Sequence, residues 1–97
     1  MWLQGAVKMG DVEVVYKIMP NGIDVNIDKL SEDIRYSIED FAKIRSIEVK
    51  PVAFGLKSIE VNLVLKDAEG ETEKAESAIN KLEDVQSVET LRVGLLL

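Results

Sequence analysis

The sequence predicts a small α+β domain, and three observations lead to this expectation. Four strand-like patterns and two amphipathic helical patterns follow one another in the order β-α-β-β-α-β. The chain of 97 residues is long enough for one domain and too short for two. Split β-α-β units in this order form a ferredoxin-like sandwich, in which two helices cover one face of a four-stranded antiparallel sheet.

The first half of the chain supplies one strand and one helix. Within 11–19, Val12, Val14, Tyr16 and Ile18 alternate with the opposite face, which predicts a strand with one buried face. The turn sequence "PNG" ends it. A helix over roughly 29–43 follows, with Asp28 as its N-cap. Its apolar residues recur at spacings of three and four: Ile27, Leu30, Ile34, Ile38 and Phe41.

The second half supplies three strands and one helix. Alternation around Ile47 and Val49 predicts a second strand, which Pro51 either ends or places at a sheet edge. "LKSIEVNLVLK" (56–66) alternates strongly and predicts the third strand. "DAEGE" (67–71) is a turn, and Thr72 is the expected N-cap of a helix over roughly 72–84, with an apolar stripe of Ala75, Ala78, Ile79 and Leu82. "VQSVETLRV" (85–93) predicts the last strand, and the final "GLLL" has no predicted partner.

The N-terminus is expected to lie outside the fold. "MGDVEV" at 9–14 leads directly into the first strand, so we interpret residues 1–8 as an N-terminal extension and residues 9–97 as the domain.

Composition argues against several classes of function. The chain has no cysteine and no histidine, which removes the usual nucleophilic pairs and the commonest zinc ligands, so no metal or cofactor is expected. The acids at 69–76 are interpreted as a solvated helix start rather than an acid/base pair. A net charge of −6 disfavours nucleic acid, and the aromatic motif of RNA-binding sheets is absent. No apolar run approaches the roughly 18 residues of a membrane span, and the lack of cysteine and of an export signal favours the cytoplasm.

The segment "PVAFG" (51–55) is the most informative motif. Pro51 restricts one backbone angle and Gly55 permits an unusual one, so together they can hold a loop that displays Phe54. A rigid, exposed aromatic side chain is a common anchor for a protein partner. The residues alone leave two interpretations open: Phe54 is displayed, or it folds back onto the end of the sheet.

Four segments together resemble a known family. They are "MGDVEVVYKIMP", "KPVAFGLKSIEVNLVL", "DAEGETEKAESAI" and "VQSVE", and the second is the most specific. Over about residues 9–93 the chain resembles archaeal elongation factor 1-beta, the nucleotide-exchange domain that serves elongation factor 1-alpha. The family has the same β-α-β-β-α-β fold, so the resemblance and the residue pattern agree.

The resemblance implies a guanine-nucleotide exchange factor that is not an enzyme. It would bind GDP-loaded elongation factor 1-alpha and speed the release of GDP, so that GTP can enter during translation elongation. It implies that Phe54 packs against the partner, that Pro51 and Gly55 shape the loop, and that Lys57 contacts the partner at the rim. The family's C-terminal end approaches the partner's magnesium and phosphate region.

The tail departs from the family pattern. Eukaryotic members of the family have a lysine at the penultimate position, and archaeal relatives often end in a basic pair. This chain ends in "TLRVGLLL", and Arg92 is the only cation of that tail. Two interpretations of Arg92 stay open: it replaces the family's basic end, or it is a solvated residue of the last strand. The alternative function, from a different class, is a small regulatory domain that binds a metabolite or dimerises through its sheet face, with Val15, Met19 and Val64 giving that face apolar character.

Overall fold

The fold is the predicted two-layer sandwich. The computed structural model describes residues 11–66 and 71–96, and for residues 95 and 96 it describes the backbone alone. The order of elements is β1 (Asp11–Pro20), α1 (Ile27–Ile38), β2 (Lys43–Pro51), β3 (Lys57–Lys66), α2 (Glu71–Asn80) and β4 (Val85–Leu96). The expected extension over 1–8 and most of the expected turn at 67–71 lie outside the described residues.

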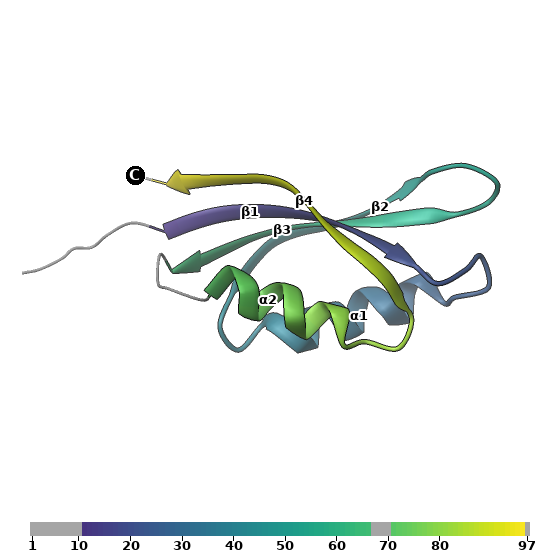
Figure 1. Cartoon of the computed structure of the whole chain (residues 1–97), viewed down its shortest axis with the longest axis horizontal. Helices are drawn as coiled ribbons and strands as arrows, with labels where there is room; N and C mark the ends of the chain where they lie inside the picture. The colour runs from purple at the N-terminus through teal and green to yellow at the C-terminus, as the bar shows by residue number, and fades with distance from the viewer. Residues whose placement is uncertain (1–10, 67–70, 97) are drawn as a thin grey trace, which may run out of the picture.

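The four strands form one sheet in the order β2-β3-β1-β4, and all of its pairings are antiparallel. Both helices lie on the same face, as Figure 1 shows, which leaves the other face open. β1 and β3 are the central strands, and β2, which carries Pro51 as its last residue, lies at an edge as predicted.

The hydrophobic core fills the space between the helices and one face of the sheet. The alternating residues of β1 and β3 are buried, and Tyr16 is fully buried with its hydroxyl donating to the Thr72 carbonyl oxygen at 3.0 Å. The helices contribute most of the expected stripes, whereas Phe41 and Leu82 lie beyond the helix ends and are partly buried against the core. The buried helix residues are Leu30, Ile34, Ile38, Ala75 and Ile79.

The bounds of α1 differ from the prediction at both ends. Asn26, not Asp28, is the N-cap: its side-chain oxygen accepts from the Lys29 N–H at 3.1 Å, and Asp28 lies within the first turn. The helix ends at Ile38 rather than near residue 43. Lys43 already pairs with Val64 of β3. Pairing in the sheet therefore ends the helix earlier than the apolar spacing predicted.

α2 and β4 also depart from the expected bounds. Thr72 is not an N-cap but lies inside α2, which begins at Glu71 and ends at Asn80, four residues before the predicted end. The sequence assigned no partner to the tail, and the structure shows that β1 is the partner of residues 94–96. Gly94 and residues 95 and 96 pair with β1 opposite Glu13, Val12 and Asp11, because β1 offers hydrogen-bonding groups along its whole length.

Candidate functional site: the tip of the β2–β3 hairpin

The candidate site is the connection between β2 and β3, which lies at one end of the molecule together with the β1–α1 connection (Figure 1). Pro51 pairs with Lys57 as the last rung of the ladder. Beyond it, the Val52 N–H donates to the Leu56 carbonyl oxygen at 2.9 Å, and the Leu56 N–H donates to the Ala53 carbonyl oxygen at 3.0 Å. The tip is therefore closed by its own backbone hydrogen bonds.

The backbone at the tip takes left-handed angles at two successive residues. Phe54 has φ +55° and Gly55 has φ +81°. Positive φ at both central residues, with a hydrogen bond across the four-residue turn, is the signature of a type I′ turn, for which Asn-Gly is the preferred sequence. Glycine takes this conformation without strain, whereas a left-handed phenylalanine costs about 1–2 kcal/mol.

The Phe54 side chain is exposed. It is 96% accessible, the highest value among the exposed large apolar residues that the structure describes. Of the two interpretations left open by the sequence, the structure therefore supports display rather than packing on the sheet. The strained backbone at Phe54 does not improve packing, because the side chain it positions is exposed. Strain of this kind is common at functional sites.

Three other predicted site residues lie beside Phe54. Pro51 and Gly55 are exposed at the tip, and Lys57 is the exposed first residue of β3. Gly55 and Lys57 also line a surface groove of about 370 Å³, together with Val49 and the β1–α1 connection. The hairpin thus brings together the whole "PVAFG" segment and Lys57.

Arg92 does not join this group. It lies in β4 opposite Val15, on the open face of the sheet, and Val15 in turn faces Asn62 of β3. Asn62 and Lys57 are separated by five steps along β3, or roughly 17 Å at ~3.4 Å per residue. Any contact made by Arg92 is therefore separate from a contact made by the hairpin tip.

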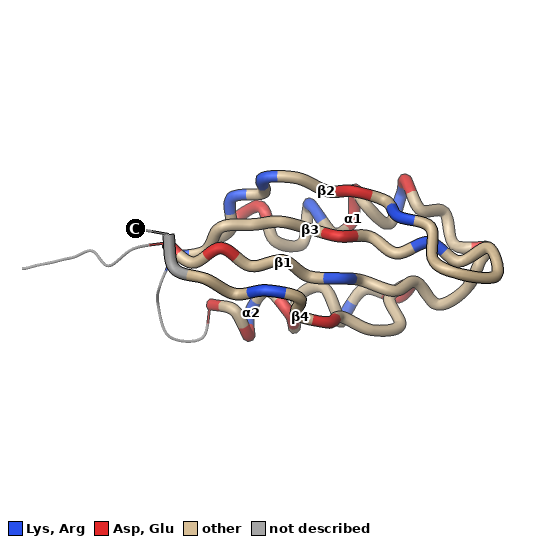
Figure 2. The backbone as a smooth tube through the Cα atoms, turned by 90° about the horizontal axis from the view of Figure 1, so that it is seen from above, with Lys and Arg blue, Asp and Glu red and all other residues tan. Residues whose placement is uncertain are grey.

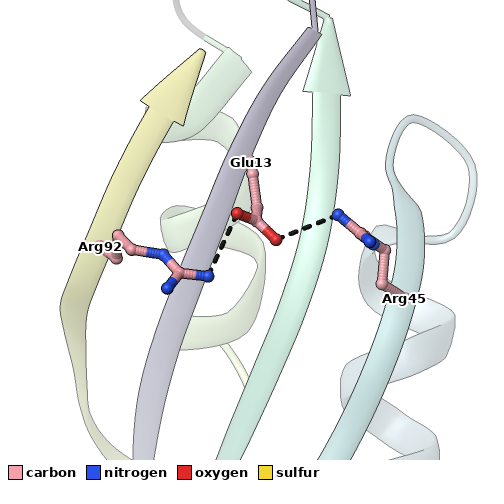
Figure 3. Close-up of polar contacts among 3 residues, drawn as sticks. All are labelled: Glu13, Arg45 and Arg92. Atoms are coloured by element: carbon pink, nitrogen blue, oxygen red, sulfur yellow. Dashed lines mark hydrogen bonds and ion pairs between the residues drawn. The ribbon is translucent and has the colours of Figure 1, made fainter. Parts of the chain in front are cut away.

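The Arg92 guanidinium is held by a neighbouring carboxylate, as Figure 3 shows. Its Nη2 lies 3.1 Å from Glu13 Oε1, and Arg45 Nη1 lies 3.1 Å from Glu13 Oε2. Both arginines lie next to or within irregularities of the edge strands, where the pairing of β2 and of β4 shifts register. Glu13 in the central strand thus links the two edges of the sheet.

The open face also carries a second ion-paired group. Lys50 Nζ lies 3.1 Å from Glu60 Oε1 and 3.7 Å from Glu48 Oε1. The hydrogen bond with Glu60 raises the pKa of Lys50 above its ordinary value. Figure 2 shows acidic and basic residues interspersed along the strands of this face.

Charge is unequally divided between the two layers. Among the described residues, the strands carry seven Lys and Arg and five Asp and Glu. The helices and connections carry four Lys and Arg and eleven Asp and Glu. The helical layer therefore holds the negative charge of the molecule, and the open sheet face is close to neutral.

Sequence reasoning missed two exposed residues at the hairpin end. Ile23 in the β1–α1 connection is 69% exposed, and Val52 is 46% exposed. Ile23 has the same signal that identified Phe54, namely a large apolar residue next to a glycine inside a turn. The same criterion, applied to the segment "PNGID", identifies Ile23 as an exposed apolar residue.

No three His, Cys, Asp or Glu side chains within 11–66 and 71–96 gather closely enough to hold a metal ion. Neither α1 nor α2 is long and apolar enough to cross a membrane.

Comparison with known proteins identifies the family. A model of the EF-1 guanine nucleotide exchange domain matches residues 13–96. Elongation factor 1-beta of Methanothermobacter thermautotrophicus is 37% identical over 89 residues, covering 92% of this chain and all of the relative. The same factor of Methanococcus aeolicus is 43% identical, covering 91% of this chain and all of that relative. The chain belongs to the EF-1 guanine nucleotide exchange domain family, and its function is guanine-nucleotide exchange in translation elongation.

Solved structures support the fold. The ACT domain from the GTP pyrophosphokinase of Chlorobium tepidum superposes with a TM-score of 0.61 at 20% identity, covering 84% of this chain and 99% of that domain. The C-terminal domain of the MgtC protein from Mycobacterium tuberculosis has a TM-score of 0.58 at 12% identity and covers 88% of each chain. At such low identity these likenesses concern the architecture alone.

Proposed function

We propose that this chain binds the GDP-bound form of elongation factor 1-alpha through the tip of the β2–β3 hairpin and speeds the release of GDP. The observation that carries the proposal is Phe54, which is 96% exposed on a strained turn that is closed by backbone hydrogen bonds. A preformed aromatic anchor loses little conformational freedom on binding, so most of its contact energy is available to the complex.

Exchange of this kind requires no chemical step by the factor itself. The GTPase holds its nucleotide through phosphate contacts and a magnesium ion, and the factor favours a shape of the GTPase in which those contacts are weaker. Because the coupling is reciprocal, bound GDP weakens binding of the factor by the same free energy. A thousandfold faster release corresponds to roughly 4 kcal/mol, which a few well-placed contacts can supply. The factor acts in this scheme as a binding protein rather than an enzyme, in the cytoplasm, with residues 9–97 as its exchange domain.

The hairpin, rather than the tail, is the proposed point of action. The backbone of residues 94–96 is paired with β1, and Arg92 is ion-paired with Glu13, so neither extends from the sheet as the basic end of a related chain would. Contact of Arg92 with the partner is a secondary proposal, in which the partner would compete with Glu13 for the guanidinium. Lys57 and Pro51 are proposed as rim contacts beside Phe54.

The test is the release of a fluorescent GDP analogue from elongation factor 1-alpha of the same organism. The unmodified protein is expected to accelerate release strongly, and Phe54→Ala is expected to lose at least about tenfold of this acceleration at subsaturating concentration. Tyr36→Ala is the matched control, because Tyr36 is an aromatic residue of α1 that is also exposed, at 65%. It is expected to retain the activity.

Two results would contradict the proposal. If the unmodified protein leaves GDP release unchanged from a folded, nucleotide-loaded GTPase, exchange is not its activity, and screening for stabilisation by small metabolites becomes the next step. If Phe54→Ala and Tyr36→Ala retain equal activity, exchange occurs without the hairpin anchor.

A further inference from the structure

We infer that the docking surface consists of two segments, the tip of the β2–β3 hairpin and the β1–α1 connection with Ile23. Together they form a groove that binds an apolar side chain of the partner GTPase. On the partner, a basic residue lies next to that apolar side chain. This inference rests on the proposed function and extends it to a second segment and to the chemistry of the group that is bound.

Exposed apolar side chains are concentrated at this end of the molecule. Seven large hydrophobic side chains are exposed among the described residues, and four of them belong to these two segments or to the adjoining end of β2. The four are Ile23, Val49, Val52 and Phe54. A cluster of this kind on an otherwise charged protein marks an interaction site more often than isolated exposed residues do.

The groove lies where the two segments meet. It has a volume of about 370 Å³ and is lined by Gly22, Ile23 and Val25 on one side and by Val49, Gly55 and Lys57 on the other. A methyl group built on Gly55 would lie 3.7 Å from Ile23 Cγ2, so the Ile23 side chain lies close beside the hairpin. Gly55 is exposed and has no side chain, which allows a partner side chain to approach its backbone closely.

The β1–α1 connection is held in place before any partner binds. The Asn21 N–H donates to the Asp84 carbonyl oxygen at 2.9 Å, and Asn21 Nδ2 donates to the Glu83 carbonyl oxygen at 2.6 Å. At its other end, Asn26 caps α1. Since both walls of the groove are fixed by hydrogen bonds, binding needs little ordering of the factor.

The charges at the groove define the occupant. Asp24 and Asp28 are exposed on the α1 side, and Lys57 is exposed on the hairpin side. A partner group that is apolar at its tip and flanked by Lys or Arg fits this distribution. A second copy of this chain fits poorly, because a two-fold contact at this surface would bring the same carboxylates together and both chains carry a net charge of −6.

The first experiment measures binding to nucleotide-free elongation factor 1-alpha by titration calorimetry. Ile23→Ala is expected to raise the Kd about 5- to 30-fold without changing the unfolding midpoint, because its side chain is exposed in the unbound protein. Leu91→Ala is the matched control: Leu91 is an exposed aliphatic residue of β4 on the open face, and its truncation is expected to change the Kd less than twofold. Asp28→Lys is expected to weaken binding most at low salt.

The second experiment uses the unmodified protein and follows amide hydrogen exchange with and without the GTPase. Protection is expected in residues 52–56 and also in residues 21–26. Protection of the hairpin alone, with Ile23→Ala binding as tightly as Leu91→Ala, would overturn the two-segment surface while leaving the proposed function intact. An unmodified protein that neither gains protection nor speeds GDP release would instead contradict the proposed function. Self-association that Ile23→Ala abolishes would assign the groove to a second copy and overturn the inference.

Discussion

Phe54 combines a backbone position suited to asparagine or glycine with a large apolar side chain that packs on nothing in the unbound protein. Its φ of +55° is unfavourable, and its ring is almost fully exposed. Neither property stabilises the fold. Both are explained if the ring is stabilised only in the complex, where burial against a partner offsets the strain of the turn.

Replacing Phe54 by asparagine should separate stability from function. Phe54→Asn is expected to raise the free energy of unfolding by about 0.5–1 kcal/mol, because asparagine tolerates the left-handed conformation and no packing is lost. The same variant is expected to lose most of the acceleration of GDP release. Urea unfolding and the GDP-release assay measure the two effects, and a variant that is less stable or fully active would contradict this account.

Tyr16 should make stability depend on alkaline pH. Burial, with a further contribution from Glu76, raises the pKa of Tyr16 from 10.0 to about 12. Between these values the folded protein keeps a phenolic proton that the unfolded chain has lost, so its stability is complete below pH 10 and falls as the pH rises toward 12.

Tyr16→Phe tests this dependence. The variant should lose about 1 kcal/mol of stability at neutral pH, together with its hydrogen bond to the Thr72 carbonyl oxygen, and should show a shallower decrease above pH 10. Tyr36→Phe, at an exposed position, should keep the decrease of the unmodified protein. Urea unfolding from pH 8 to pH 12 measures the three curves, and parallel curves would show that Tyr16 is not responsible.

At the scale of single elements, the N-terminus of α1 shows how geometry chooses between two capping residues. Both Asn26 and Asp28 are good N-cap types, and only the position of the first helical turn decides between them. Asn26 has the extended backbone of a cap, with φ −73° and ψ 102°, and accepts from the Lys29 N–H. Asp28 can interact only with the helix dipole.

The two variants Asn26→Ala and Asp28→Ala should therefore differ. Asn26→Ala is expected to lower the free energy of unfolding by about 1 kcal/mol, and Asp28→Ala by only a few tenths. Both side chains are exposed, so packing is equal in the comparison. A larger loss for Asp28→Ala than for Asn26→Ala in urea unfolding would indicate that the helix begins two residues later.

At the scale of the whole molecule, charge separates into an acidic helical layer and a nearly neutral sheet face. The molecule is also elongated, with extents of 55 × 20 × 16 Å, and the proposed docking surface lies at one end of its long axis. Such a distribution orients the molecule in the field of a partner whose surface is basic near the docking site.

Association with the GTPase should consequently depend on salt. Raising the ionic strength from about 0.05 M to 0.5 M is expected to slow association several-fold, while the dissociation rate changes less, because screening acts mainly on the encounter. Stopped-flow mixing measures both rates. A dissociation rate that carries most of the salt effect would place the charge pairs inside the interface instead.

Local sequence patterns were sufficient to predict the fold and to locate the candidate site in the β2–β3 connection. Apolar residues alternate with period two in β1 and β3 and recur every three or four residues in both helices. These patterns show which face of each element is buried, and they can be read within a short stretch of sequence. The pairing of proline and glycine around Phe54 is also local, and it identified this segment, whereas the exposure of Phe54 in the structure favours display over packing on the sheet.

The ends of the elements and the meeting of residues distant in the chain depend on tertiary packing, and local patterns did not predict them. Lys43 pairs with β3, so α1 ends early, and residues 94–96 pair with β1, because backbone pairing depends on the neighbouring strand and not on side-chain period. The approach of Ile23 to the hairpin and the ion pair of Arg92 with Glu13 bring together residues far apart in the chain. Such neighbours follow from the packing of the whole sheet, which no local pattern records.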